Sequence, residues 1–384
     1  MGKSTGKKRT LVYFTIFVVL FALVILPIIA VFSEAVIVDG RFDFSSALQT
    51  IADKDNVTTI TNSMLLGFLV VIVSTIISTP LAFLLARTRF SRWKWLDIVL
   101  MIPFMTPPYI SSMGWILFMQ KRGLFQQMFP WTGSISESFF SLGGLVFAMS
   151  FHVFPFMTTM IKNAILNIGM NLEASAAVSG AGFTYRLRKV MLPLLTGNYA
   201  IAMLLVFVKT LSEYGTPSTL GNRIGFYVFT TDIHRYASTA PIDFGKASSL
   251  SSVLVIICMV MWLVQNYTTS KHTYSLVGGK GKRESLYNCR RVTEIIGGIY
   301  IFLVIIVTIG VPYFSVIATS LIKLRGYGLA AGNFTFQHYV ELFTNNSKGW
   351  EAMLTSTFLA LVSATVASAL GTLIVVSIKK AKLC

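Results

Sequence analysis

Long apolar runs alternate with short polar segments along most of the chain. A helix needs about 20 consecutive apolar residues to cross a bilayer. Eight runs meet this length, at residues 11–33, 63–86, 97–119, 141–162, 196–217, 247–267, 292–320 and 351–378. The pattern therefore predicts an all-α fold, a polytopic membrane helix bundle of about eight transmembrane helices. The first run is too long for the apolar part of a signal peptide, and no small-residue cleavage site follows it.

Two adjacent prolines interrupt the third run. Pro107 and Pro108 stand in the stretch "MTPPYISSMGW". Proline has no amide hydrogen and breaks the helical hydrogen-bond pattern. We expect the pair to break the third span or to set its end. The backbone carbonyls freed there can line a cavity or be satisfied by neighbouring helices.

The composition supports a membrane protein and the distribution of charge orients it. The chain is 54% hydrophobic and 12% charged, with a mean hydropathy of +0.70, whereas soluble domains carry about 25% charged residues. The net charge of +17 does not indicate nucleic acid, because the basic residues gather in alternate segments. Cytoplasmic loops carry such an excess. We therefore expect a multi-pass protein of the cytoplasmic (inner) membrane with both termini cytoplasmic. The richest segments are 3–9, 87–94, 162–189, 271–291 and 379–382.

A weak internal repeat divides the chain. "FDF" at 42–44 precedes the second span and "FTF" at 334–336 precedes the eighth. The shared order is a span, an outward loop with F-x-F, and a further span. We assign 1–60 to an N-terminal span and outward loop, 61–267 to a transmembrane permease domain, 268–291 to a Gly- and Lys-rich cytoplasmic linker, and 292–384 to an incomplete second half.

No set of residues indicates catalysis, a resident metal or a cofactor. "GKST" at 2–5 lacks the preceding glycine and strand of a phosphate-binding loop. The three cysteines, Cys258, Cys289 and Cys384, form no disulfide or metal pattern. We therefore expect a protein that is not an enzyme.

Three ionisable residues in or near the spans are candidates for function, because such residues are often functional in membranes. His152 has no second metal-binding residue at helical spacing, which favours hydrogen-bonded packing over a metal or proton site. Lys209 and Glu213 are four residues apart and share one helix face. They could form an ion pair that makes their burial tolerable or line a solute pathway, and both interpretations are open.

The segment 173–195 is too polar to span a membrane and too regular in pattern to be a tether. "LEASAAVSGAG" predicts a short helix of small residues that ends at glycine. "FTYRLRKVML" predicts a basic amphipathic piece at the cytoplasmic interface. Pro193 then stops or redirects the chain. Small residues permit close approach of another surface, so the segment is typical of a docking element for a cytoplasmic partner.

This segment resembles the signature loop of permease subunits in type I binding-protein-dependent ABC importers. That signature reads Glu-Ala-Ala, three residues, Gly, nine residues, Ile-x-Leu-Pro. Here nine residues separate Gly180 from Val190, and Leu192 and Pro193 follow. The acid stands one position early, at Glu173. The resemblance implies that the loop contacts an ATPase through Glu173, Ala174, Ser175, Ala176, Ala177, Gly180, Leu192 and Pro193.

Three further stretches are similar to the fused permeases of iron(III)-type importers. They are "LSEYGTPSTLG" at 211–221, "PIDFGKASSL" at 241–250 and "YSLVGGKGKR" at 274–283. The resemblance implies a permease that moves a small solute, with ferric ion favoured. It also implies cytoplasmic ATPase subunits and an extracytoplasmic solute-binding protein as partners. An ion-coupled secondary transporter is the alternative, since such proteins also show repeats and broken spans.

Only one docking loop is present in this sequence, whereas an ATPase dimer presents two grooves. We therefore expect a second permease fragment to supply the other loop. By analogy with the first unit, roughly four spans and that loop are missing from the second, which follows residue 290.

Overall fold

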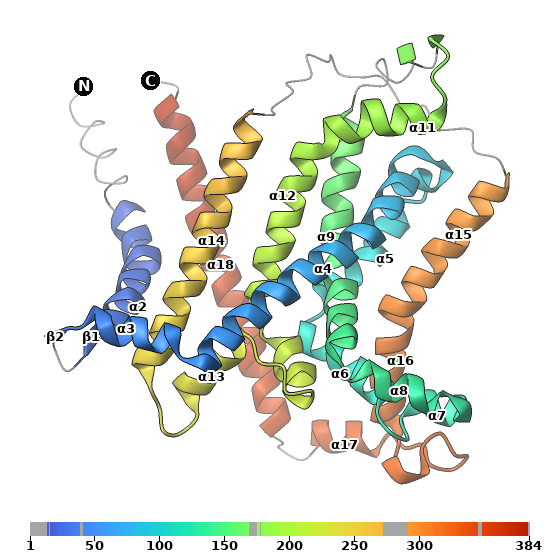
Figure 1. Cartoon of the computed structure of the whole chain (residues 1–384). Helices are drawn as coiled ribbons and strands as arrows, with labels where there is room; N and C mark the ends of the chain where they lie inside the picture. The colour runs from blue at the N-terminus through green and yellow to red at the C-terminus, as the bar shows by residue number, and fades with distance from the viewer. Residues whose placement is uncertain are drawn as a thin grey trace, which may run out of the picture. The chain divides into compact units, whose positions relative to one another are not determined.

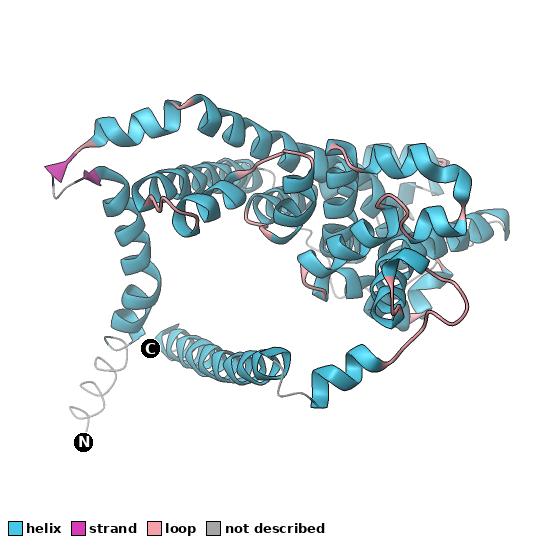
Figure 2. Cartoon of the chain, turned by 90° about the horizontal axis from the view of Figure 1, so that it is seen from below, coloured by secondary structure: helices cyan, strands magenta, loops and turns pink. Residues whose placement is uncertain are grey.

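The computed structural model is helical almost throughout (Figures 1 and 2). It describes residues 14, 16–38, 41–168, 175–176, 178–271, 291–344 and 348–382. Two compact units are present: one is Ala35–Thr319, and the other combines Met1–Glu34 with Ser320–Cys384. The predicted all-α membrane fold is confirmed.

The larger unit contains most of the helices. Its long helices are α4 (Lys54–Arg87), α9 (Leu142–Asn167), α12 (Leu192–Leu211), α14 (Phe244–Lys271) and α15 (Arg291–Ile305). Its shorter α-helices are α3 (Phe44–Ala52), α5 (Lys94–Met105), α6 (Pro108–Met119), α7 (Leu124–Met128), α8 (Gly133–Phe139), α11 (Phe183–Arg186) and α13 (Phe229–Ser238). Its other elements are β1 (Ile37–Val38), β2 (Arg41–Phe42), and the 3-10 or π turns η2 (Arg89–Arg92), η3 (Pro130–Thr132), η4 (Leu187–Met191), η5 (Pro217–Gly221) and η6 (Ile306–Gly310).

The smaller unit holds the two ends of the chain. In its C-terminal part, η7 (Arg325–Tyr327) and α17 (Gln337–Thr344) precede the long helix α18 (Lys348–Lys382). The Asn333 side chain donates hydrogen bonds to the carbonyls of Leu324 and Gly328, both at 2.8 Å, and so closes the loop before α17. Helices η1 (Phe21–Ile25) and α2 (Leu26–Val36) belong to the N-terminal span, and α16 (Val311–Leu321) ends the seventh.

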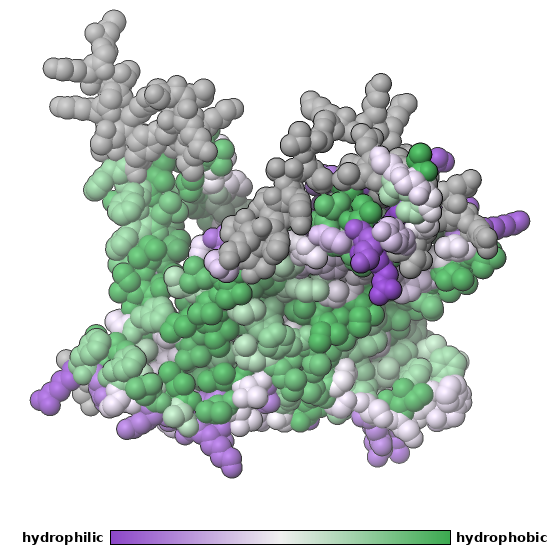
Figure 3. All heavy atoms as spheres, turned by 45° about the horizontal axis from the view of Figure 1, so that its top comes forward, coloured by the Kyte–Doolittle hydropathy of each residue, from purple (hydrophilic) through white to green (hydrophobic). Residues whose placement is uncertain are grey.

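Seven helices in the described part of the chain are long and apolar enough to cross a membrane, and a bent pair makes an eighth. The seven are 16–36, 54–87, 142–167, 187–211, 244–267, 291–321 and 348–376. Figure 3 shows apolar side chains over most of the visible face and hydrophilic ones mainly toward its edges. The predicted spans are therefore present. Helix α4 begins nine residues before its apolar run, because the Asp53 side chain caps it by accepting from the Asp55 amide.

The third predicted span is not a straight helix. Helices α5 and α6 meet at an angle of 87°. The bend falls at Pro107 and Pro108, as the sequence indicates. Because neither proline has an amide hydrogen, the carbonyls of Pro103 and Phe104 lose their helical donors there. A single continuous crossing over 97–119 is thus replaced by two helices.

Helix α9 is the most buried of the candidate spans, with 72% of its apolar window inside the structure. One apolar cluster packs around Phe154 of α9 and brings together α4, η2, α5 and α15. A second cluster joins Phe207 and Leu211 of α12 to Phe229 and Leu250. The buried helix α9 is therefore in contact with several other helices of the larger unit, among them α4, α5 and α12.

The two F-x-F stretches open the same sequence of elements. Each follows a span and an antiparallel pairing, Ile37 with Phe42 in one case and Ile322 with Phe334 in the other. The middle residue of each stretch then caps a short helix. Asp43 accepts from the amides of Ser45 and Ser46, and Thr335 accepts from the amide of Gln337. A long apolar helix follows each short one, α4 and α18 respectively. The order of elements predicted for the repeat is present in both copies.

Candidate functional site

The described part of the segment 173–195 begins with a short helical piece that ends at Gly180. The amide of Ser179 donates to the carbonyl of Ser175 at 3.1 Å, and the amide of Ala181 donates to that of Ala176 at 2.9 Å. Gly180 has a φ of +83°. This bond across a left-handed glycine is the Schellman motif. The helix ends at a glycine, but at Gly180, two residues before Gly182, where the predicted stretch 172–182 closes. Glu173, Ala174 and Ala177 lie outside the described residues.

The second half of the segment is helical without interruption from Phe183 to Leu211. Figure 1 shows α11 lying across the end from which α12 descends. The turn between them is η4, in which the amide of Leu192 bonds to the carbonyl of Leu187. Such a π turn accommodates Pro193, which has no amide to donate. Pro193 thus redirects the chain without ending the helix.

The surface of this segment has room for another protein. Val178 is 90% exposed and Tyr185 is 60% exposed. Arg188 and Lys189 are exposed beside them. A Cβ atom added at Gly180 would meet nothing within 4 Å. Apolar, aromatic and cationic side chains on an open, small-residue surface suit protein contact. We call residues 175–193 the docking segment.

The break in the third span lies directly against the loop that follows α12. A Cβ atom on Gly215 would stand 2.8 Å from the Tyr109 amide nitrogen, so only glycine permits this approach. The hydroxyl groups of Ser112 and Thr219 are hydrogen-bonded at 2.7 Å. The loop after α12 is therefore packed onto the start of α6.

Helix α16 holds the other side of the break. The hydroxyls of Thr106 and Tyr313 are hydrogen-bonded. A Cβ atom on Gly114 would lie 2.6 Å from the Pro312 carbonyl oxygen, so the backbones of α6 and α16 are in close contact. The break is thus a fixed feature of the bundle, held by α16 as well as by the loop after α12.

His152 lies beside this break and is buried, with 3% of its surface exposed. Its ring stacks on Phe104, with centroids 6.2 Å apart, and lies next to the Pro103 backbone. The Pro103 carbonyl has no helical donor because residue 107 is proline. Among the described residues no three His, Cys, Asp or Glu side chains form a metal-binding group. The stacked Phe104 ring is the surrounding of a packed side chain, and a packing role for His152 remains a prediction.

Lys209 and Glu213 lie close in sequence but have different surroundings. Glu213 is buried, and its carboxylate accepts a hydrogen bond from the Thr216 amide at 2.9 Å. Lys209 is exposed, with its ammonium group 6.0 Å from the Phe104 ring centroid. The ion pairs of the described residues do not include one between them. The two side chains therefore form no direct ion pair, and a solute-pathway role for Lys209 and Glu213 remains a proposal.

Exchanging Lys209 and Glu213 is expected to destabilise the chain. A lysine at 213 would be buried and could not accept the Thr216 amide, and an uncompensated buried charge costs about 3–5 kcal/mol. Glu213→Gln keeps the acceptor oxygen and Lys209→Met changes an exposed position, so each should cost about 1 kcal/mol or less. Thermal unfolding of the purified chain in detergent measures all three. Recovery of stability on exchange, after loss in both single variants, would show a direct ion pair and contradict this assignment.

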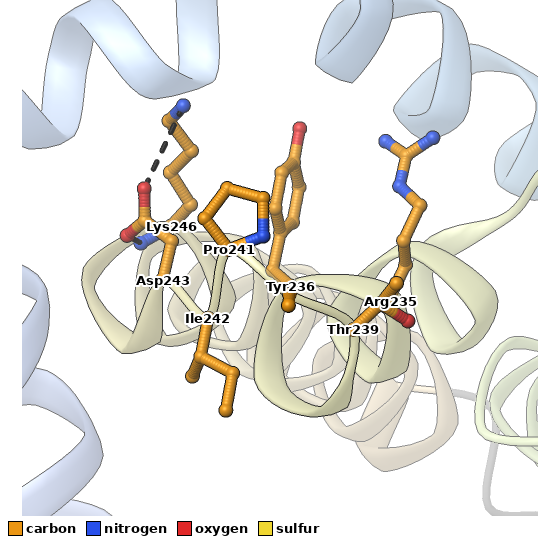
Figure 4. A pocket seen from close by; sticks show the side chains of 8 residues that line it. Arg235, Tyr236, Thr239, Pro241, Ile242, Asp243 and Lys246 are labelled. Carbon is orange, nitrogen blue, oxygen red and sulfur yellow. Dashed lines mark hydrogen bonds and ion pairs between the residues drawn. The ribbon is translucent and has the colours of Figure 1, made fainter.

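One pocket lies at the junction of α13 and α14, with a volume of about 320 Å³. Figure 4 shows Arg235, Tyr236 and Lys246 pointing to the same side. Both cations lie against the Tyr236 ring and pair with acids, Arg235 with Asp232 at 3.3 Å and Lys246 with Asp243 at 3.6 Å. The stretch 241–250, which the sequence analysis singled out, contains Asp243 and Lys246, whereas no motif marked Arg235 and Tyr236.

The family profile described as "Binding-protein-dependent transport system inner membrane component" matches residues 78–270. This range includes the docking segment, the broken third span and helices α9 and α12. The assignment of a permease domain to 61–267 remains a prediction.

Individual relatives share about a quarter of the matched residues. A putative ferric transport system permease protein, FbpB 1 of Haemophilus influenzae, is 25% identical over 272 residues, which is 70% of this chain and 42% of that protein. The sulfate transport system permease protein CysT of Salmonella typhimurium is 23% identical over 56% of this chain and 77% of its own length. The chain thus spans about two fifths of the length of the ferric-type relative that it matches.

A solved structure supports the fold. One chain in the crystal structure of a bacterial alginate ABC transporter, in complex with a periplasmic protein bound to an alginate pentasaccharide, aligns with a TM-score of 0.52 and 15% identity. The alignment covers 70% of this chain and 96% of that chain. At this identity the likeness concerns the arrangement of helices.

Proposed function

Because this chain belongs to the family of binding-protein-dependent transport system inner membrane components, we propose that it is the permease of an ATP-driven importer. In this proposal it moves a small solute across the cytoplasmic membrane, with ferric ion as the favoured solute. ATP is hydrolysed by a partner chain. The observation that carries the proposal is the docking segment, which joins α9 to α12 inside the matched range and presents an open surface of small, apolar and cationic residues.

The proposed cycle uses this segment as the point of force transfer. A cytoplasmic ATPase dimer closes on ATP and displaces the docking segment. Because the helix from Phe183 to Leu211 is continuous, the displacement reaches the membrane directly through α12. Packed helices respond to such a displacement as rigid bodies. The bundle then turns from inward- to outward-facing, and an extracytoplasmic solute-binding protein delivers the solute.

The second groove of the ATPase dimer needs a second docking segment. We propose that a further permease element supplies it, either as more of the same protein or as a separate chain. We also propose that both termini of this chain lie on the cytoplasmic side. The basic residues gather in alternate segments of the chain, and the docking segment and both termini fall in these basic-rich segments.

Ferric ion is favoured because, of the two relatives described above, the ferric-type permease matches the larger share of this chain. The sulfate-type relative makes an oxyanion the second candidate solute. An exposed cation near the break, Lys209, would suit an anion.

Solute uptake into membrane vesicles of controlled orientation tests the proposal. The vesicles contain this chain, its partner ATPase and solute-binding protein, and the second permease element. We expect uptake of radiolabelled iron(III) that requires ATP and is unaffected by excess sulfate. ATP-dependent uptake of sulfate instead of iron would identify sulfate as the solute and leave the proposed mechanism unchanged. Uptake that follows an ion gradient in the absence of ATP would contradict the importer and favour a secondary transporter.

A further inference from the structure

Arg87 is the last residue of α4 and is buried, with 4% of its surface exposed. Its Nη2 donates to two backbone carbonyls at the end of α9, that of Ile165 at 2.9 Å and that of Ile168 at 3.1 Å. Helix α9 ends at Asn167, a few residues before the docking segment. The guanidinium group therefore joins the C-terminal ends of α4 and α9.

The end of α9 suits a buried guanidinium group. The last carbonyls of a helix have no donor within the helix, and they carry the negative end of its dipole. A buried arginine in turn needs acceptors for its hydrogen-bond donors. Hydrogen bonds to charged groups are stronger than neutral ones. The Ile165 carbonyl also accepts from the Ile168 amide at 3.2 Å, so Arg87 adds a second, charged donor there and joins the last turn of α9 to α4.

A second charged contact holds the same turn region of α9 from another side. Lys162 lies 2.6 Å from both carboxylate oxygens of Asp97, which stands in the first turn of α5. The Lys162 side chain is 16% exposed. Helix α5 runs from this contact to the break at Pro107. The end of α9 is consequently linked to α4 by Arg87 and, through Asp97, to the helix that leads into the broken span.

We propose that Arg87 is a positioning residue for coupling: it fastens the end of α9 to α4, so that a displacement of the docking segment moves the bundle. This inference rests on the proposed importer function. With Arg87 in place, α9 and α4 move together when the ATPase closes. Without the Arg87 side chain, the last turn of α9 moves independently of α4, and ATP is hydrolysed without a change in the helix bundle.

The test compares Arg87→Met with Arg89→Met in vesicles that contain the partner ATPase, binding protein and second permease element. Methionine keeps the apolar stem and removes the donors. Arg89 is a matched control two residues away, because its side chain is 55% exposed and pairs with Glu294 at 2.9 Å. Solute uptake, ATP hydrolysis, ATPase co-purification and thermal unfolding of the permease are measured together. Arg87→Lys, which retains a charge and donors, is the conservative variant.

We expect Arg87→Met to lower solute imported per ATP by about tenfold, the loss that corresponds to one charged hydrogen-bond contact. ATPase binding and hydrolysis should stay within about twofold of wild type. Arg87→Lys should recover part of the loss, and Arg89→Met should transport as wild type does. Uptake per ATP by Arg87→Met equal to wild type would overturn the inference. So would a parallel fall of uptake, hydrolysis and unfolding temperature, which indicates a structural role alone. If wild type itself shows no ATP-driven uptake, the proposed function fails, and this inference fails with it.

Discussion

Gly180→Ala is expected to abolish most solute uptake while leaving membrane insertion intact. Gly180 has a φ of +83° and ends the short helix of the docking segment. A side chain in this left-handed conformation costs about 1–2 kcal/mol. The bond from the Ala181 amide to the Ala176 carbonyl depends on that turn. Because the strain is comparable to a tenfold change in an equilibrium, the docking surface should lose its shape in a large fraction of molecules.

Gly182→Ala is the matched control for this change. Gly182 lies two residues away, and a Cβ atom there also meets nothing within 4 Å, but its φ is not positive. Uptake and co-purification of the ATPase are measured for both variants. We expect loss of both in Gly180→Ala and wild-type values in Gly182→Ala. Equal behaviour of the two variants would mean that the turn at Gly180 does not shape the docking surface.

Gly144→Ala is expected to prevent recovery of a folded chain. A Cβ atom on Gly144 would lie 1.8 Å from the Phe139 carbonyl oxygen, in the tight corner between α8 and α9. The obstacle is backbone, and the same carbonyl accepts the Ser141 amide at 2.9 Å, so the corner cannot shift without losing that bond. Overpacking of a tight site costs about 1–3 kcal/mol or more, and we expect the upper end here. Since α9 is the most buried candidate span, its start affects the whole larger unit.

Gly143→Ala provides the comparison for Gly144→Ala. A Cβ atom on Gly143 meets only the Ser141 Oγ at 3.5 Å, an ordinary contact. Alanine also favours a helix by about 1 kcal/mol over glycine. Size-exclusion profile and thermal unfolding in detergent should therefore be unchanged or slightly improved for Gly143→Ala. A monodisperse, wild-type melting profile for Gly144→Ala would show that the corner between α8 and α9 is not closed as described.

The sequence predicts the membrane spans well because a span needs a run of about 20 consecutive apolar residues, which is a local pattern. It also locates the bend in the third span, since two prolines without amide hydrogens leave little alternative. It does not predict the angle of 87°. That angle is set by long-range contacts, such as Gly215 against the Tyr109 backbone, which no local pattern encodes.

Contacts between distant residues account for what the sequence pattern missed. The four-residue spacing of Lys209 and Glu213 suggested an ion pair, but the Thr216 amide bonds to the Glu213 carboxylate instead. In the sequence, Arg87 served only as one of the basic residues that orient its loop. Its contact with α9 was not predicted, because its acceptors at Ile165 and Ile168 lie about 80 positions further along the chain. An arginine directly at the end of an apolar run is the sequence signal that could have identified this contact.

The most direct test of the central claim is cross-linking from Val178, which is 90% exposed on the docking segment. Val178→Cys is placed in a chain whose three native cysteines are replaced by alanine. The complex is purified with its ATPase and treated with a short reagent that has a thiol-reactive maleimide at one end and a photoactivatable group at the other, and it is then illuminated. The account predicts a cross-link to the ATPase whose yield changes when ATP is added. A Val178→Cys chain that supports ATP-driven uptake yet forms no cross-link to the ATPase, with or without ATP, would contradict it.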